Sequence, residues 1–199
     1  MNFKMLILLL LTGMTTANAK GFDCLVITNN GDSLKLRLDI PYFLLLDRPK
    51  IGEIEDKIRV LDNDSIKKIT VTEVKSASFV DKGEVYHLVP KCFDDAYISK
   101  SCFFVRLLVE GDLQLIYYSV KVREFKKPPT YPEYLRYQRE NGDFHVFPLF
   151  FNKTVKSIEQ LKKVLGNCPM LIEKLEKGEI PLDDHIKIAK EYNSLCKRR

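Results

Sequence analysis

The chain of 199 residues contains no tryptophan and only three histidines. Sugar-binding platforms often stack a tryptophan on the sugar ring, so its absence argues against a carbohydrate-binding protein, although the nine tyrosines offer a substitute. None of His87, His145 and His185 lies in a catalytic motif, and the sequence has no GxSxG, HExxH, Walker or GxGxxG pattern. We therefore expect structural or surface roles for the histidines and no catalytic residue.

Metal-binding and redox motifs are also missing. The pairs Asp94-Asp95 and Asp183-Asp184 are typical of solvated loops and helix starts rather than of acid–base catalysis. We expect no metal and no cofactor, because no CxxC pair or Cys/His cluster occurs among the five cysteines: Cys24, Cys92, Cys102, Cys168 and Cys196.

No apolar run is long enough to cross a bilayer, which takes about twenty residues. The one unbroken run, residues 5–11, follows Lys4 and precedes Ala17-Asn18-Ala19, where small residues occupy the two positions that a signal peptidase reads. This pattern predicts a removable secretory signal over residues 1–19 and a mature chain without a transmembrane segment. A membrane anchor is the alternative, but the run is too short and polar threonines follow it.

The charge balance is mildly basic, with a formal net charge of +5 at pH 7. The cations are spread along the chain, and only Lys197-Arg198-Arg199 forms a run. Whatever this balance, the export signal argues against a nucleic-acid role. We expect a protein of the periplasm or cell surface whose partner is an envelope protein or a glycan.

Strand-like patterns fill residues 20–150. Within residues 33–40, apolar and polar side chains alternate strictly, which is typical of a strand with one buried face. Asn30-Gly31, just before this strand, predicts a two-residue type I′ hairpin that places Ile27 opposite Leu34.

A second pair of strands is expected at residues 103–109 and 113–122, around the turn Glu110-Gly111-Asp112. Apolar residues on both faces of these strands are typical of a central position in a sheet. Further strands are expected at 57–61, 69–74, 84–89 and 144–149.

From residue 152 the hydrophobic period becomes helical. Gly166 with Pro169, and Gly178 with Pro181, divide this region into three short helices. The sequence therefore predicts one α+β domain over residues 20–199, with an antiparallel β-rich body (20–150) and a small C-terminal helical cluster (151–199).

Two disulfides are expected in an oxidising compartment. Cys168 begins the second predicted helix and Cys196 ends the third, so antiparallel packing brings them together. Cys92 and Cys102 bracket a predicted loop and form the second candidate pair, unless both are small buried thiols. Cys24 is then the unpaired cysteine.

A segment rich in tyrosine and proline, residues 126–142, is expected to be an exposed loop or arm. It is a candidate partner surface because tyrosine and arginine often anchor interfaces. The alternative is a helix that caps the sheet with its tyrosines facing inward. The residues concerned are Tyr131, Tyr134, Tyr137, Arg136 and Arg139.

The chain resembles uncharacterised exported proteins of Bacteroidetes-type bacteria. The similarity lies in VITNNGD (26–32), in LLVEGD with LIYY (107–118), and in the tail segments LGNCP (165–169) and EYNSLC (191–196), which are similar to the "DCP" and "YN-x-C" ends of those proteins. The resemblance implies an envelope protein with a β-rich domain, fused in some relatives to an outer-membrane β-barrel. It implies no activity and no catalytic residue.

These observations favour an exported, non-enzymatic binding or interaction module of the cell envelope. The alternative is an envelope hydrolase of an unrecognised kind. A deep pocket that joins His87 or His145 to acidic residues would indicate the enzyme. A shallow surface with a hydrophobic or aromatic patch would indicate binding.

Overall fold

The computed structural model describes residues 18–43, 47–54, 56–62, 65–95, 98–119, 122, 130–139, 144–148, 158–166 and 168–196. The fold is α+β, with an antiparallel β-rich body and three short helices toward the C-terminus. The elements are β1 (Asn18–Thr28), β2 (Ser33–Phe43), β3 (Arg48–Pro49), η2 (Ile51–Glu53), β4 (Lys57–Asp62), β5 (Ser65–Thr70), β6 (Val74–Asp81), β7 (Glu84–Asp95), β8 (Ile98–Val109), β9 (Leu113–Ser119), β10 (Glu133–Arg139), β11 (Phe144–Pro148), α2 (Ile158–Leu165), α3 (Pro169–Glu176) and α4 (His185–Leu195).

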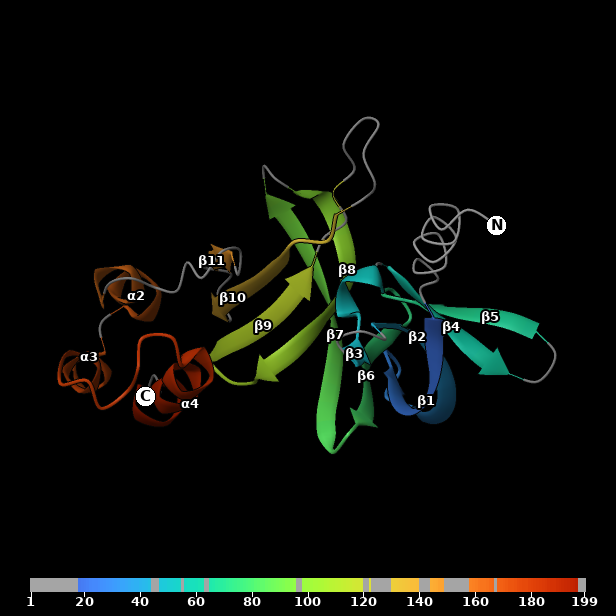
Figure 1. Cartoon of the computed structure of the whole chain (residues 1–199), viewed down its shortest axis with the longest axis horizontal. Coiled ribbons are helices and arrows are strands. Elements are labelled where there is room, and N and C mark those ends of the chain that lie inside the picture. Colours follow the sequence, from blue (N-terminus) through green and yellow to red (C-terminus); the bar gives the residue numbers. More distant parts are fainter. Residues whose placement is uncertain are drawn as a thin grey trace, which may run out of the picture.

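The strands form one antiparallel sheet in the order β11-β10-β9-β8-β7-β6-β1-β2-β4-β5, and β3 pairs with β2 beside this path. Most neighbours in the sheet are also neighbours in sequence, as expected for a meander of hairpins. The exceptions are β1, which lies between β2 and β6, and β4, which pairs with β2 although the short β3 comes between them in sequence. The helices lie beside β9, β10 and β11 at one end of the molecule, and β4 and β5 extend from the other end (Figure 1).

The sheet carries two separate cores. The first lies between β1, β2, β4, β6 and β7, and includes fully buried Val26, Leu38 and Ile40. The second lies between the helices and the β8–β10 strands, and includes Leu115 and Leu161. A third cluster, in which three of five residues are aromatic, contains Phe93, Phe103, Val105, Ile116 and Tyr118. Strand β8 contributes to both cores, with Phe104 in the first and Val109 in the second, and so connects the two ends of the molecule.

The first hairpin differs from the sequence prediction by one residue. Thr28 N–H donates to the Asp32 carbonyl, and Gly31 N–H donates to the Thr28 carbonyl, which leaves a three-residue loop. Gly31 adopts φ 91°, so the loop is a type I turn followed by a left-handed glycine. Val26, rather than Ile27, therefore lies opposite Leu34. This one-residue shift points Leu25 away from the core.

Two further predictions about the strands are corrected. The segment expected to be an exposed loop contains β10 (Glu133–Arg139), which pairs with both β9 and β11. The strand expected at 69–74 is instead the end of β5, a turn over residues 71–73 and the start of β6. Lysine and two serines dilute the apolar pattern of β6, which explains why periodicity alone missed it.

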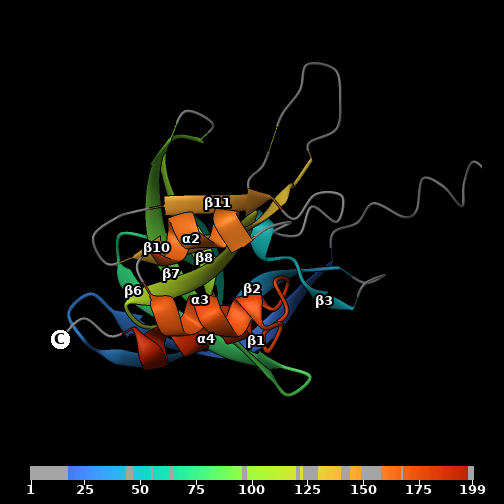
Figure 2. The ribbon, with the colours of Figure 1, turned by 90° about the vertical axis from the view of Figure 1, so that its left-hand side faces the viewer.

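The helices form as expected from their end signals. Pro169 occupies the first turn of α3, where its missing N–H costs no hydrogen bond. The Asp184 side chain accepts a hydrogen bond from the Lys187 N–H (3.0 Å) and caps α4, which therefore begins at His185 rather than at Pro181. Figure 2 shows α2, α3 and α4 in front of the sheet. Among the described residues no helix is long and apolar enough to cross a membrane.

The first strand begins within the predicted signal. Asn18 and Ala19 pair with Tyr42 and Pro41 at the start of β1, while the rest of that segment lies outside the described residues. Lys20 follows directly and pairs with Ile40.

Candidate functional site

The cysteines pair as the sequence predicts. Cys92 and Cys102 lie directly opposite each other on β7 and β8, with Cα atoms 3.9 Å apart. Cys168, before α3, bonds to Cys196, after α4, with Cα atoms 5.8 Å apart. Cys24 is a free, buried thiol, and burial raises its pKa to about 12, so it stays protonated and unreactive at neutral pH.

The tail motif joins the helices to the sheet. The Asn193 side chain accepts a hydrogen bond from the Leu113 N–H (2.8 Å) and donates to the carbonyls of Leu113 (3.0 Å) and Glu110 (3.2 Å). Gly111 makes room for this contact, since a Cβ there would lie 2.6 Å from the asparagine amide. Tyr192 is buried beside it in the second core. The Tyr-Asn-x-x-Cys segment is therefore a structural element.

The five residues of the predicted partner surface do not form one exposed patch. Tyr137 and Arg136 are buried (0% and 3% exposed), and the Arg136 guanidinium lies 4.5 Å from the Phe93 ring centroid. Arg139 donates to the Val164 carbonyl at the end of α2 (2.6 Å). Tyr131 and Tyr134 are partly exposed, and Tyr134 stacks on Tyr118 within the sheet. These side chains mainly hold β10 in place.

The histidines are distributed over the fold. His87 Nδ1 lies 2.7 Å from the Ser78 hydroxyl, directly across β6 and β7. His185 is buried, and its Nδ1 lies 2.9 Å from the Tyr137 hydroxyl. The His145 side chain lies outside what the structure describes, although its backbone belongs to β11. Among the described residues no carboxylate is hydrogen-bonded to His87, so they supply no orienting acid for the Ser–His pair.

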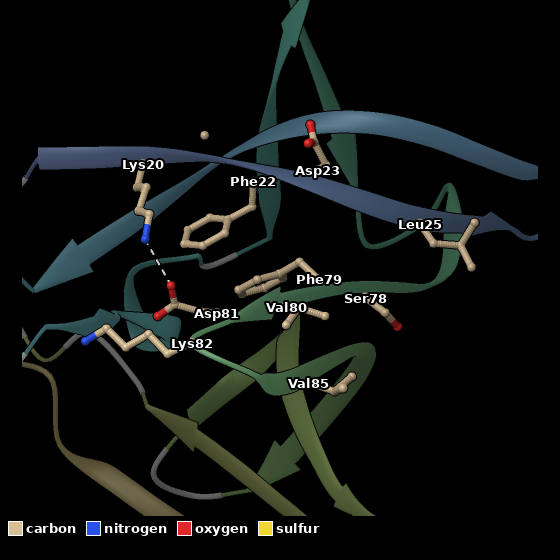
Figure 3. A pocket seen from close by; sticks show the side chains of 11 residues that line it. Lys20, Phe22, Asp23, Leu25, Ser78, Phe79, Val80, Asp81, Lys82 and Val85 are labelled. Carbon is tan, nitrogen blue, oxygen red and sulfur yellow. Dashed lines mark hydrogen bonds and ion pairs between the residues drawn. The ribbon is translucent and has the colours of Figure 1, made fainter.

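Strands β1 and β6 separate and leave an open cleft. They pair only where residues 25–28 meet residues 74–78, whereas β1 continues back to Asn18 with β2 on its other side. Figure 3 shows the two strands diverging from the Leu25 end toward the Lys20 end. The hollow between them has a volume of about 700 Å³. We call it the β1–β6 cleft; its lining is Lys20, Gly21, Phe22, Asp23, Leu25, Ser78, Phe79, Val80, Asp81, Lys82 and Val85.

Aromatic rings form the floor of the β1–β6 cleft. Phe22 and Phe79 meet beneath it with ring centroids 4.7 Å apart, and Phe79 stacks on Tyr86. The Arg106 guanidinium covers the Tyr86 ring at 3.9 Å and also bonds to Glu84. Side chains therefore bridge the gap below the two strands where backbone pairing has ceased.

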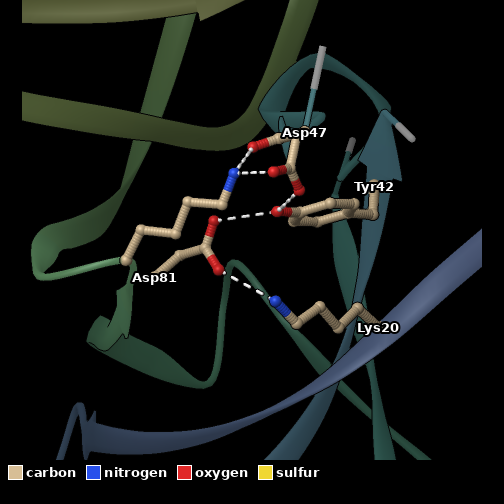
Figure 4. A network of polar contacts seen from close by, with 5 residues as sticks. Lys20, Tyr42, Asp47 and Asp81 are labelled. Carbon is tan, nitrogen blue, oxygen red and sulfur yellow. Dashed lines mark hydrogen bonds and ion pairs between the residues drawn. The ribbon is translucent and has the colours of Figure 1, made fainter. Parts of the chain in front are cut away.

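A polar network closes the wide end of the cleft (Figure 4). The Tyr42 hydroxyl, with its single proton, lies within hydrogen-bond distance of both Asp47 (2.9 Å) and Asp81 (3.2 Å). Lys20 pairs with buried Asp81 (3.0 Å), and Lys82 pairs with Asp47. Burial and the two carboxylates raise the pKa of Tyr42, and hydrogen bonds from Lys82 and Tyr42 lower the pKa of Asp47. Tyr42 therefore acts as a neutral hydrogen-bond donor between two carboxylates.

The rim of the cleft is apolar and exposed. Leu25, Val80 and Val85 are 46%, 58% and 61% exposed, and Val80 and Val85 face each other across the β6–β7 turn. Three exposed aliphatic side chains around one hollow are more than the isolated apolar residues of an ordinary surface. A second hollow of about 600 Å³ continues from the cleft across β1 to β2, lined by Asp23, Cys24, Leu25, Lys35, Leu36 and Arg37.

Sequence reasoning missed these rim residues for an identifiable reason. The predicted type I′ turn of the first hairpin placed the Leu25 side chain on the buried face. Strand β6, which carries Val80, was not predicted. The available signal was Gly83: with Lys82 it forms a two-residue turn at positive φ (52° and 81°), the geometry of a type I′ hairpin.

The chemistry of the cleft suits binding. Its lining offers aliphatic and aromatic contacts, backbone groups and charged side chains, and the described residues contain no group of three or more His, Cys, Asp or Glu placed to hold a metal. Comparison of the chain with protein-family models, curated proteins and solved structures finds no significant match.

Proposed function

We propose that this protein is an exported, non-enzymatic binding module of the cell envelope. The observation that carries the proposal is the open β1–β6 cleft, which combines an aromatic floor with the exposed rim of Leu25, Val80 and Val85. Large exposed apolar patches mark interaction sites. Because the cleft is shallow and open along the sheet, it suits a macromolecular partner better than a small enclosed substrate.

The sequence and the disulfides support the proposed location in the cell envelope. The signal-like segment before Lys20 predicts export, and the two disulfides suit an oxidising compartment. The resemblance to exported proteins of Bacteroidetes-type bacteria points to the same compartment. Its tail motifs coincide with the Cys168–Cys196 disulfide and with Asn193, which fit a structural role in attaching the helices rather than a reactive site.

One contact favours the alternative of a hydrolase, namely the 2.7 Å approach of the Ser78 hydroxyl to His87. Nucleophilic serines usually need a base that a third group orients. A serine-reactive fluorophosphonate probe tests this alternative. Labelling that Ser78→Ala abolishes would establish a nucleophile; we expect no labelling of either chain.

The binding proposal is tested by substituting the rim. We expect Val80→Lys combined with Val85→Lys to abolish the capture of specific envelope proteins or glycans from extracts of the source organism, as identified by mass spectrometry. The matched control is Ile186→Lys on α4, where an apolar side chain 43% exposed lies far along the chain from the cleft. Equal capture by the rim variant and the control would contradict the proposal, provided that circular dichroism shows both are folded.

A further inference from the structure

The cleft exposes the backbone edges of two strands. Residues 20–24 of β1 pair with β2 on one side, and no pairing with β6 is formed along them within the described residues. Residues 79–81 of β6 likewise pair only with β7. In an antiparallel sheet alternate residues direct their N–H and C=O groups to opposite sides. Each strand therefore turns a row of donors and acceptors toward the cleft.

Such a row has one natural chemical complement. An extended polypeptide presents the same alternation of N–H and C=O at the same spacing, and the addition of a strand to an exposed edge is a recurring mode of peptide recognition. A flat sugar ring or a small ion matches only part of the row. Unpaired edges that are not blocked also invite pairing with another chain.

We propose that the β1–β6 cleft binds an extended segment of a partner protein as an added β-strand along residues 20–24 of β1. This inference rests on the proposed binding function and names the class of partner. The five residues span about 16 Å of strand, so a comparable length of partner is held. The Lys20–Asp81 ion pair and the Phe22–Phe79 contact lie on the core side and form the floor under this strand (Figure 3).

The side chains around the cleft specify the partner segment further. Alternate residues of an added strand point to the outer face, where Leu25, Val80 and Val85 offer apolar contacts. Of the cations that line the cleft and the adjoining hollow, Lys20 and Lys82 already pair with Asp81 and Asp47. The remaining lining charges are Lys35 and Arg37 against Asp23, an excess of one positive charge. The fitting segment therefore alternates aliphatic and polar residues and carries a net negative charge.

The experiment uses a phage-displayed library of random linear peptides, selected on the mature protein and counter-selected on the Val80→Arg variant. We expect enrichment of acidic peptides with alternating aliphatic residues. We then expect N-methylation of every second backbone amide in a selected peptide to weaken binding about tenfold or more per position, while methylation of the intervening amides has little effect. Ile186→Arg is the matched protein control and should bind like the parent.

Three results overturn the inference: no peptide that depends on Val80, equal tolerance of methylation at all positions, or protection of amides elsewhere than residues 20–24 when hydrogen exchange is measured with bound peptide. Capture of an envelope glycan that the Val80→Lys, Val85→Lys variant loses would overturn the strand-addition mode and leave the binding function standing. Loss of both the peptides and the rim-dependent capture would overturn both proposals.

Discussion

Asn193 binds the β8–β9 hairpin as a neighbouring strand would, because its amide donates to backbone carbonyls and accepts from a backbone N–H. Three hydrogen bonds from one side chain connect α4 to a turn about eighty positions earlier in the chain. Few side chains could replace this asparagine, because the position needs both a hydrogen-bond donor and an acceptor. Aspartate lacks the donor, and leucine lacks both. The second core therefore depends on this residue as well as on apolar packing.

We predict that Asn193→Ala lowers the free energy of unfolding by about 1–3 kcal/mol, because it leaves partly buried backbone groups of the hairpin without their partner. Urea denaturation followed by circular dichroism measures this loss. Ser194→Ala, at the exposed next position, is the control and should change stability by less than about 0.5 kcal/mol. Similar effects of the two substitutions would show that the contact does not stabilise the fold.

His185 makes the stability depend on pH. Burial against Tyr137 lowers its pKa in the folded protein, although the nearby Asp183 and Asp184 carboxylates oppose this shift. The unfolded chain, with a histidine pKa of about 6.5, then binds a proton more readily than the native state. The free energy of unfolding therefore falls as the pH drops below about 6.5 and stops falling once the folded histidine is also protonated.

The test compares the parent with His185→Gln between pH 7.5 and pH 5. We expect the variant to be less stable at neutral pH and to lose less stability on acidification than the parent. Parallel pH profiles for the two proteins would refute a role for His185 in acid sensitivity.

At the level of strands and helices, sequence reasoning succeeded where the signals are local. The fold class, the β8–β9 hairpin, the helical cluster and both disulfides were predicted, because turn residues, periodicity and cysteine positions carry them. The predicted register of the first hairpin was wrong by one residue, because Asn30-Gly31 fits a two-residue turn and a three-residue loop equally well. The prediction of a loop at residues 126–142 was wrong. Prolines and tyrosines suggested a loop there, whereas residues 133–139 form β10 and pair with two strands.

The two disulfides differ in their access to solvent, and this predicts an order of reduction. Cys92 is exposed at its cross-strand position, whereas Cys168 is buried in the second core. A dithiol reductant must reach a sulfur atom to exchange with it, so Cys92–Cys102 should be reduced first. Stepwise treatment with dithiothreitol, alkylation and peptide mass spectrometry give the order. Earlier alkylation of Cys168 and Cys196 would show that exposure does not govern access.

For the whole molecule, the decisive feature is a single sheet that packs in two hydrophobic cores and in which strands β1 and β6 cease to pair along part of their length. This could not be predicted from sequence, because the separation depends on where strands far apart in the chain cease to pair. No residue pattern within 20–24 signals it. The predicted partner surface failed to form one patch for the opposite reason, since Tyr137 and Arg136 resemble interface anchors but pack inside the sheet.

Site-specific photocrosslinking in the intact source cells tests the central claim, that the β1–β6 cleft is the binding site, most directly. A benzophenone amino acid is placed at Val80 in one chain, at Val85 in a second and at Ile186 in a third, all of which are exposed positions. We predict that the two cleft positions give the same discrete protein adduct and that Ile186 does not give it. The account is contradicted if the same adduct forms at Ile186, or if folded, exported protein forms no adduct at either cleft position.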